Sequence, residues 1–314
     1  MKKMLFQAFV AFGLFVTPTF AATFGPLVSP QDLNAVADAD KPLIIDIRGN
    51  SKDGASLFEQ GHIAGSVNAP YGLFRGPKEN PGQLVTEEHL EKVLGDIGAE
   101  KDRATVIAYQ GANISDFGTA ARVYWTLKSA GFTDIAILNG GLNNWEQQGL
   151  SFEIGAVSPQ KTTIDVSFSD EWRASREEIL KIVNGEETAR LVDARPEEFW
   201  KGEKKHPAAA KPGTLPQSEY FVHSSWFDNK PVIADAAKVK QLANEAGFKG
   251  GEELVSFCNT GHWAATNWFA LSELAELDNV KLYPESVVGY SNAGYDLANT
   301  PGLVQTLIKQ VTGG

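Results

Sequence analysis

The segment KPLIIDIR, residues 41–48, is an apolar run rich in β-branched side chains, and it ends in an Asp-x-Arg step. The segment ARLVDAR, residues 189–195, has the same form and the same ending. A short apolar run of this composition predicts a buried β-strand, and the polar residues mark where the strand leaves its sheet. The recurrence predicts that the chain contains two copies of one structural unit.

The flanks of this strand also repeat. A helix is expected ahead of each copy, opened by Ser29-Pro30 in the first and by Ser175 in the second, where Glu178 completes a capping box. A glycine-led turn follows each copy, GHIAGS at 61–66 and GTLPQS at 213–218. The order of helix, strand and turn is therefore the same in both halves of the chain.

A second strand, loop and helix recur as well. The predicted segments are strands at 104–109 and 253–257, loops at 110–118 and 258–263, helices at 120–130 and 264–277, and last strands at 134–138 and 280–283. Gln110 opens the first loop and Cys258 opens the second. The offset between these two residues matches that between Asp46 and Asp193 to within one residue.

Strands that alternate with helices of this length predict parallel α/β units, whose ligand side is the carboxyl end of the strands. The chain is therefore expected to be α/β, with two tandem domains that are each a parallel sheet flanked by helices. The first domain is expected at residues 22–154 and the second at 164–314, joined by a linker near Gly155–Thr163.

The amino terminus, residues 1–21, has the layout of a secretory signal peptide. Lys2 and Lys3 precede an apolar run from Met4 to Val16, and small residues precede the expected cut after Ala21. The run is too short for a membrane span, which needs about 20 apolar residues. We expect an exported protein without a membrane anchor after cleavage, located in the periplasm if the organism is Gram-negative.

Composition excludes several classes of function. The formal net charge is −11, which argues against a nucleic-acid partner because such proteins carry clustered basic residues. Cys258 is the single cysteine, so an intrachain disulfide and a CxxC pair are both excluded. The five histidines are dispersed and no phosphate-binding glycine motif is present, so we expect neither a metal nor a cofactor.

The order of these motifs resembles the rhodanese sulfurtransferases of the tandem, thiosulfate or 3-mercaptopyruvate type. The resemblance rests on the Asp-x-Arg steps, on GHIAGS at 61–66, on the strand–loop–helix units and on LNGG at 138–141 with Trp145, and it covers the chain after the leader. It implies that the first domain lacks a nucleophile and that the second domain is catalytic, with its cysteine at the start of a short loop. Gln110 and Cys258 occupy the corresponding positions.

Cys258 is placed as a nucleophile should be, between a buried strand and a helix. Gly261 permits a positive φ, so the loop can curl and turn its backbone N–H groups toward the sulfur. The amino-terminal end of the following helix adds positive potential, and both effects favour the thiolate. The alternative interpretation is a small buried apolar residue, a common role of free cysteine.

Six further residues are candidates for substrate binding. The resemblance implies that Arg195 contacts the anionic group of the substrate, and the alternative is a salt bridge to Asp193. The histidine of the loop could assist the thiolate or contact an anion, or could be a polar filler, and the tryptophan could be a pocket wall or a cover of the core. The candidates are Arg195, Asn259, Thr260, Gly261, His262 and Trp263.

The loop differs from related loops in charge. Asn259 and Thr260 are neutral where thiosulfate-type members carry basic residues, so the attraction for an anionic donor is expected from backbone N–H groups, the helix end and Arg195. Residue 264 is alanine, so the Cys-x5-Arg loop of the related phosphatases is absent.

The resemblance implies a sulfurtransferase that moves sulfane sulfur from thiosulfate, through a Cys258 persulfide, to cyanide or a thiol acceptor. Two alternatives remain open at this point. One is a 3-mercaptopyruvate sulfurtransferase, and the other is a non-catalytic module that binds a sulfur species or a partner protein. The sequence leaves open the physiological donor and acceptor, the oligomeric state and the role of His262.

Overall fold

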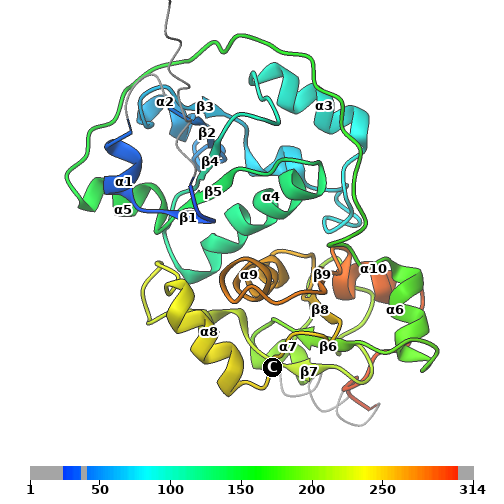
Figure 1. Ribbon diagram of the computed structural model, residues 1–314. Coiled ribbons are helices and arrows are strands. Elements are labelled where there is room, and N and C mark those ends of the chain that lie inside the picture. Colours follow the sequence, from blue (N-terminus) through cyan, green and yellow to red (C-terminus); the bar gives the residue numbers. More distant parts are fainter. Residues whose placement is uncertain (1–23, 37–40, 303–314) are drawn as a thin grey trace, which may run out of the picture.

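The computed structural model describes residues 24–36 and 41–302. The expected signal peptide, residues 1–21, lies outside them. The chain forms two α/β domains that lie against each other, the first drawn above the second in Figure 1. No helix in the described part of the chain is long and apolar enough to cross a membrane.

The first domain contains a parallel sheet of five strands in the order β1-β5-β4-β2-β3. The strands are β1 (Leu27–Val28), β2 (Leu43–Asp46), β3 (Val67–Asn68), β4 (Thr105–Ala108) and β5 (Ile135–Leu138). Asp46, the last residue of β2, pairs with Ala108 at the end of β4. The predicted Asp-x-Arg step is therefore at the carboxyl edge of the sheet.

The second domain contains a parallel sheet of four strands in the order β7-β6-β8-β9. The strands are β6 (Arg190–Asp193), β7 (Glu219–Tyr220), β8 (Leu254–Phe257) and β9 (Val280–Leu282). A single parallel bridge between Arg173 and Leu282 takes the place that β1 has in the first domain. Asp193 pairs with Phe257, so Cys258 leaves the sheet beside the Asp-x-Arg step. The predicted fold class is confirmed.

Helices connect the strands in both domains. They are α1 (Pro30–Asn34), α2 (Leu57–Gln60), α3 (Glu87–Asp96), α4 (Phe117–Ser129), α5 (Gly141–Gln147), α6 (Arg176–Val183), α7 (Glu197–Trp200), α8 (Ala236–Glu245), α9 (Trp263–Phe269) and α10 (Ser286–Asn292). Ser29 caps α1, and Ser175 forms the predicted capping box with Glu178 on α6. The helix predicted at 264–277 is α9 followed by a π-helical turn at Ala270–Leu274.

The two domains share one hydrophobic core. The inner face of the first sheet packs on α3 and α4, the inner face of the second packs on α8 and α9, and these residues form one continuous cluster. The outer faces pack separately, against α1 and α5 in the first domain and against α6 and α10 in the second. Figure 1 shows α4 facing α9 where the domains meet. Cys258 belongs to the shared cluster.

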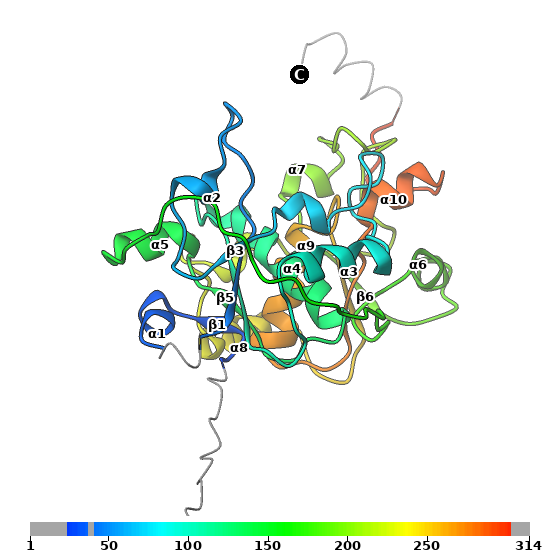
Figure 2. The ribbon, with the colours of Figure 1, turned by 90° about the horizontal axis from the view of Figure 1, so that it is seen from above.

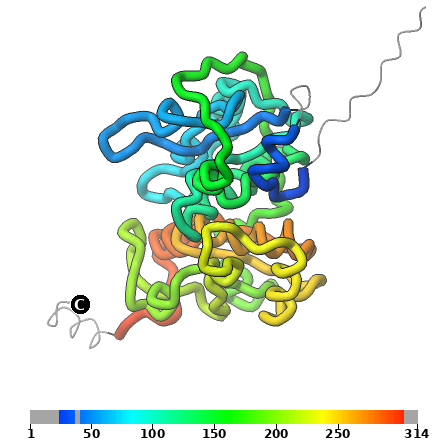
Figure 3. Tube along the Cα trace, turned by 90° about the vertical axis from the view of Figure 1, so that its left-hand side faces the viewer, coloured from blue at the N-terminus to red at the C-terminus, as the bar shows by residue number. Residues whose placement is uncertain are grey.

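The linker between the domains runs along the outside of the first domain, as Figures 1, 2 and 3 show. Residues 156–169 contain no helix or strand. The N–H of Thr162 donates to the carbonyl oxygen of Gly95, and the N–H of Phe168 donates to the carboxylate of Glu87. The linker is therefore held against α3 before it enters the second domain.

Phe117 offers a test of the shared core. It is 0% exposed, and its ring lies 5.5 Å from that of Phe269 and 5.7 Å from that of Phe227, centroid to centroid. We predict that Phe117→Ala lowers the free energy of unfolding by about 3–5 kcal/mol, because it leaves a cavity between the domains. Urea unfolding should show a single transition in which both domains unfold together. Ile154→Ala, at a side chain that is 81% exposed, should change little. Two separate transitions, only one of them shifted, would contradict a shared core.

Candidate active site

Cys258 lies at the carboxyl end of the central strand β8, as predicted. Its thiol is free and the residue is 1% exposed. The loop that follows, residues 258–262, leads into α9. Asn259 and Thr260 are 4% and 8% exposed, so the loop is enclosed as well. The carboxyl end of a parallel strand is where the fold places ligands, which makes this loop the candidate active site.

Ser286, at the start of α10, is hydrogen bonded to the loop. Its Oγ accepts hydrogen bonds from the N–H groups of Cys258 at 3.0 Å and Gly261 at 3.2 Å, and donates one to the carbonyl oxygen of Tyr283 at 2.9 Å. Of the loop N–H groups, these two are therefore bound to Ser286. Ser286 was not identified from the sequence, because it lies in a distant segment and no local motif marks it.

The carbonyl groups of the loop are all hydrogen bonded. Those of residues 258 and 259 accept from the N–H groups of Val287 at 3.1 Å and Val288 at 3.0 Å, and that of residue 262 accepts from Ala265 at 3.2 Å. The other two accept from arginine side chains of the first domain. Every peptide plane of the loop is thus fixed by its oxygen.

This arrangement leaves donors for an anion. The N–H and C=O groups of a trans peptide point in opposite directions, so each N–H points away from the partner that holds the oxygen of the same peptide. Among the described residues, no acceptor is bound to the N–H groups of Asn259, Thr260 and His262. Gly261 has φ +67°, which gives the loop the curl that such N–H nests require. The loop can therefore hold a negatively charged sulfur.

The first domain reaches the loop with Arg75 and Arg122. Nη2 of Arg75 donates to the carbonyl oxygen of Thr260 at 2.7 Å, and Nη1 of Arg122 lies 3.4 Å from that of Gly261. A Cβ on Gly261 would lie 2.4 Å from Nη1 of Arg122, so only glycine fits there. The sequence analysis missed both arginines. The one signal for Arg122 was its position as a single charge within an apolar helical stretch.

His262 links the domains. Its Nε2 lies 2.9 Å from the carbonyl oxygen of Ser115, and its Nδ1 lies 3.2 Å from the hydroxyl of Tyr71. A carbonyl only accepts, so Nε2 carries the proton and Nδ1 accepts from Tyr71. Burial lowers the pKa of His262 to about 3, which makes the ring neutral at pH 7. The geometry supports a structural contact between domains for this residue.

Trp263 makes a similar contact. Its Nε1 donates to Oγ of Ser115 at 2.6 Å, and its ring stacks on that of His223 at 5.1 Å. The rings of Phe199 and Trp263 meet edge to face, with their centroids 5.8 Å apart. Of the two interpretations of Trp263, the contacts favour the one in which it covers the core at the domain boundary.

Arg195 is bound to Asp193. Its Nε lies 2.9 Å and its Nη2 2.6 Å from the carboxylate oxygens, and Nη2 also donates to the carbonyl oxygen of Gly213. Arg48 makes the same contacts with Asp46 in the first domain, which has no nucleophile. The salt bridge, left open as an alternative, is therefore present in both copies.

What distinguishes Arg195 is its contact with the loop. Nη1 donates to the side-chain oxygen of Asn259 at 3.1 Å, and the residue is 1% exposed. The expectation of a direct substrate contact is revised for this reason: most donors of the guanidinium already have partners. Arg195 can act on a bound molecule through the position of Asn259.

The corresponding loop of the first domain has no sulfur. Gln110 takes the position of Cys258, and its side-chain nitrogen donates to Oδ1 of Asn143 at 2.6 Å. Among the described residues no group of three or more His, Cys, Asp or Glu side chains could hold a metal ion.

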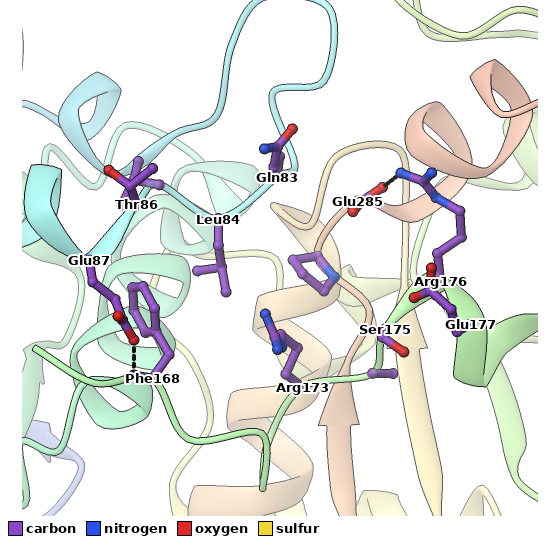
Figure 4. Close-up of a pocket in the computed structure, with 13 residues that line it drawn as sticks. Gln83, Leu84, Thr86, Glu87, Phe168, Arg173, Ser175, Arg176, Glu177 and Glu285 are labelled. Atoms are coloured by element: carbon purple, nitrogen blue, oxygen red, sulfur yellow. Dashed lines mark hydrogen bonds and ion pairs between the residues drawn. The ribbon is translucent and has the colours of Figure 1, made fainter.

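Two cavities lie at the domain boundary near the loop. One, of about 450 Å³, is shown in Figure 4, where Gln83 and Leu84 face Arg173, Ser175 and the pair formed by Arg176 and Glu285. The other, of about 650 Å³, is lined by Lys78, Glu79, Pro81, His206, Pro207, Ala208 and Asn292. Cys258 lines neither of these two cavities.

Known proteins of similar sequence and structure agree with this organisation. The rhodanese-like domain family matches the chain twice, at residues 29–148 and 175–293. A thiosulfate sulfurtransferase from Azotobacter vinelandii is 27% identical over 278 residues, which is 88% of this chain and 94% of that protein.

Solved structures show the same fold. The 3-mercaptopyruvate enzyme SseA from Escherichia coli is similar with a TM-score of 0.70 and 21% identity, over 84% of this chain and 99% of that one. An anaerobic ergothioneine biosynthesis enzyme from Chlorobium limicola has a TM-score of 0.74 and 18% identity, over 87% of this chain and 70% of that one. The two family matches cover most of the chain, and the protein belongs to the rhodanese family with two rhodanese-like domains in tandem.

Proposed function

We propose that this protein is a thiosulfate sulfurtransferase that carries sulfur as a persulfide on Cys258. The observation that carries the proposal is the Cys258 loop itself. Its five carbonyl groups are anchored, and three of its N–H groups have no acceptor among the described residues. Such a loop stabilises an anionic sulfur at a fixed position. The name of the Azotobacter relative supports thiosulfate as the donor.

The reaction has two steps. The Cys258 thiolate attacks the outer sulfur of thiosulfate, a new S–S bond forms, the S–S bond of thiosulfate breaks, and sulfite leaves with the electron pair. The persulfide then loses its terminal sulfur to cyanide, giving thiocyanate, or to a thiol, giving a new persulfide, and the thiolate is restored. The enclosed position of Cys258, 1% exposed, favours a small donor and limits access of water to the persulfide.

The other loop residues position the sulfur and are not proton carriers in this proposal. Asn259, Thr260 and His262 contribute backbone N–H groups, while Gly261 supplies the curl. Arg195 holds the side chain of Asn259 in place at 3.1 Å. The rings of His262 and Trp263 fix the loop to Ser115 of the first domain.

The alternatives make different demands. A 3-mercaptopyruvate sulfurtransferase would turn over that donor faster than thiosulfate, so kcat/KM for both donors separates the two activities. A non-catalytic binding module would never carry sulfur on Cys258 during an assay. Small anionic donors and cyanide or thiol acceptors are the partners that the proposal requires, and it involves neither nucleic acid nor a membrane.

Export remains part of the proposal. The motif at residues 1–21 supports secretion with cleavage after Ala21, and the periplasm of a Gram-negative host is the expected destination. Expression of the full chain in such a host, followed by fractionation and amino-terminal sequencing, should give a periplasmic protein that begins at Ala22. A cytoplasmic protein that still carries residues 1–21 would overturn this.

Replacement of the nucleophile is the direct test of the activity. Cys258→Ser should abolish sulfur transfer from thiosulfate to cyanide, because a hydroxyl does not ionise near pH 7 and cannot hold a persulfide. Intact mass spectrometry should show one added sulfur atom on the native protein after thiosulfate treatment, and none on the variant. Gln110→Ala, at the equivalent position, should keep its turnover. Sulfur transfer by the serine variant would sink the proposal.

The buried histidines predict a loss of stability in acid. Burial lowers the pKa of His262 to about 3 and that of His223 to about 4, so both bind a proton more readily when unfolded. Their contribution to the free energy of unfolding is fully present above about pH 6.5, the approximate pKa of an unfolded histidine. It is lost as the pH falls from there toward about 4. Each should add about 1.4 kcal/mol per pH unit to the fall in unfolding free energy near pH 5.

Urea unfolding between pH 7.5 and 4.5 measures this dependence. In His262→Gln, whose side chain cannot titrate, the free energy of unfolding should fall less steeply with decreasing pH. The difference near pH 5 should be about 1.4 kcal/mol per pH unit. A variant that keeps the full slope of the native protein would show that His262 is already protonated in the folded state.

A further inference from the structure

Arg75, which is half-buried, and Arg122, which is fully buried, differ from Arg48 and Arg195 in their partners. Arg48 and Arg195 are each bound to an aspartate. Arg75 and Arg122 donate only to carbonyl oxygens, and among the described residues neither has a carboxylate within 4.0 Å. A buried cation is unfavourable unless an anion lies near it. Each of these guanidinium groups lies over an aromatic ring, but neither has an anionic partner among the described residues.

Both guanidinium groups also keep an unused donor. Nη1 of Arg75 and Nε of Arg122 are buried and have no hydrogen-bond partner among the described residues. Arg122 is 0% exposed, so water cannot serve it from the surface. Its other nitrogens reach the carbonyl oxygens of Gly261 and Gly82, which hold the group beside the cysteine loop. Unused buried donors are rare and call for a ligand or a charge.

Four ionisable neighbours of the arginines do not supply that charge. Burial raises the pKa of Tyr71, so its hydroxyl stays protonated. Burial also lowers the pKa of His262 and of His206, so both rings are neutral at pH 7. Glu285, next to Ser286, is already bound to Arg176.

Cys258 is the remaining group. Burial lowers the pKa of Arg122 to about 9 and the neighbouring Arg75 lowers it too, while the negative charge that Cys258 can carry opposes the shift. The same charge acts on Tyr71. The geometry agrees, because Arg75 and Arg122 of the first domain are bound to the carbonyl oxygens of Thr260 and Gly261, two and three residues after Cys258.

We propose that Arg75 and Arg122 of the first domain are the counter-ions of the sulfur anion on Cys258, both as thiolate and as persulfide. This rests on the proposed function for its persulfide part. The thiolate carries one negative charge before the attack, and the persulfide carries one after sulfite has left, so fixed cations serve both states without rearrangement. The basic charge that the neutral loop lacks at Asn259 and Thr260 is supplied across the domain boundary.

The thiolate itself gives the readout. A thiolate absorbs ultraviolet light that a thiol does not, and Cys258 is the single cysteine, so the difference from Cys258→Ser protein isolates it. Arg75→Gln should raise the pH midpoint of thiolate formation by about one unit, because an opposite charge close by favours the charged form. Below the midpoint that is about a tenfold loss of thiolate. Arg75→Lys should keep most of the native value.

Two further variants sharpen the result. Arg122→Gln should raise the pH midpoint of thiolate formation as Arg75→Gln does. If the Arg122→Gln protein does not fold, the midpoint of Arg75→Gln is the test of the proposal. Lys128→Gln is the matched control, because Lys128 is a cation at the same domain boundary that already pairs with Glu273 at 2.8 Å. It should leave the midpoint unchanged. An unchanged midpoint in folded Arg75→Gln, or an equal rise in Lys128→Gln, would overturn the assignment.

The measurement uses no sulfur donor, so it separates this inference from the proposed function. A raised midpoint in a protein that transfers no sulfur would keep the thiolate assignment and reject the function. An unchanged midpoint with normal sulfur transfer would keep the function and reject the counter-ions.

Discussion

The hydrogen bonds from Arg75 and Arg122 to the carbonyl oxygens of Thr260 and Gly261 connect the cysteine loop to the first domain. Together with the N–H groups of Val287 and Val288 on α10 and of Ala265 on α9, they bind all five carbonyl groups of the loop. The N–H groups of Asn259, Thr260 and His262 then remain without an acceptor among the described residues. The loop can present donors to an anionic sulfur because its acceptors are bound elsewhere, and part of that binding comes from the other domain.

The two copies of the fold have taken different roles around a shared frame. Both contain the aspartate–arginine pair, at the end of β2 in the first copy and of β6 in the second, where it ties the following turn to the sheet. In the first copy Gln110 fills the nucleophile position and bonds to Asn143. The first domain instead contacts the second domain with α4 and with the turn around Arg75. The loss of a nucleophile and the gain of a supporting surface are compatible because the shared core joins the inner faces of both domains.

Features that depend on local pattern were predictable from the sequence. The strand ends at Asp46 and Asp193, the capping box at Ser175 and the position of Cys258 all follow from residues that are neighbours in the chain. Arg75, Arg122 and Ser286 were missed, because their contacts join segments far apart in sequence and no motif marks them. The partner of Arg195 was left open for a related reason: spacing places the guanidinium near both Asp193 and the loop, and only packing decides which contacts form.

The most direct test of the account is a crystal structure of the native protein after treatment with thiosulfate. The account predicts one additional sulfur atom on Sγ of Cys258, surrounded by the N–H groups of the loop, with Arg75 and Arg122 as its nearest cations. An unmodified Sγ in protein that turns over thiosulfate would contradict the persulfide. A bound sulfur whose nearest cations belong to the second domain would contradict the part assigned to the first.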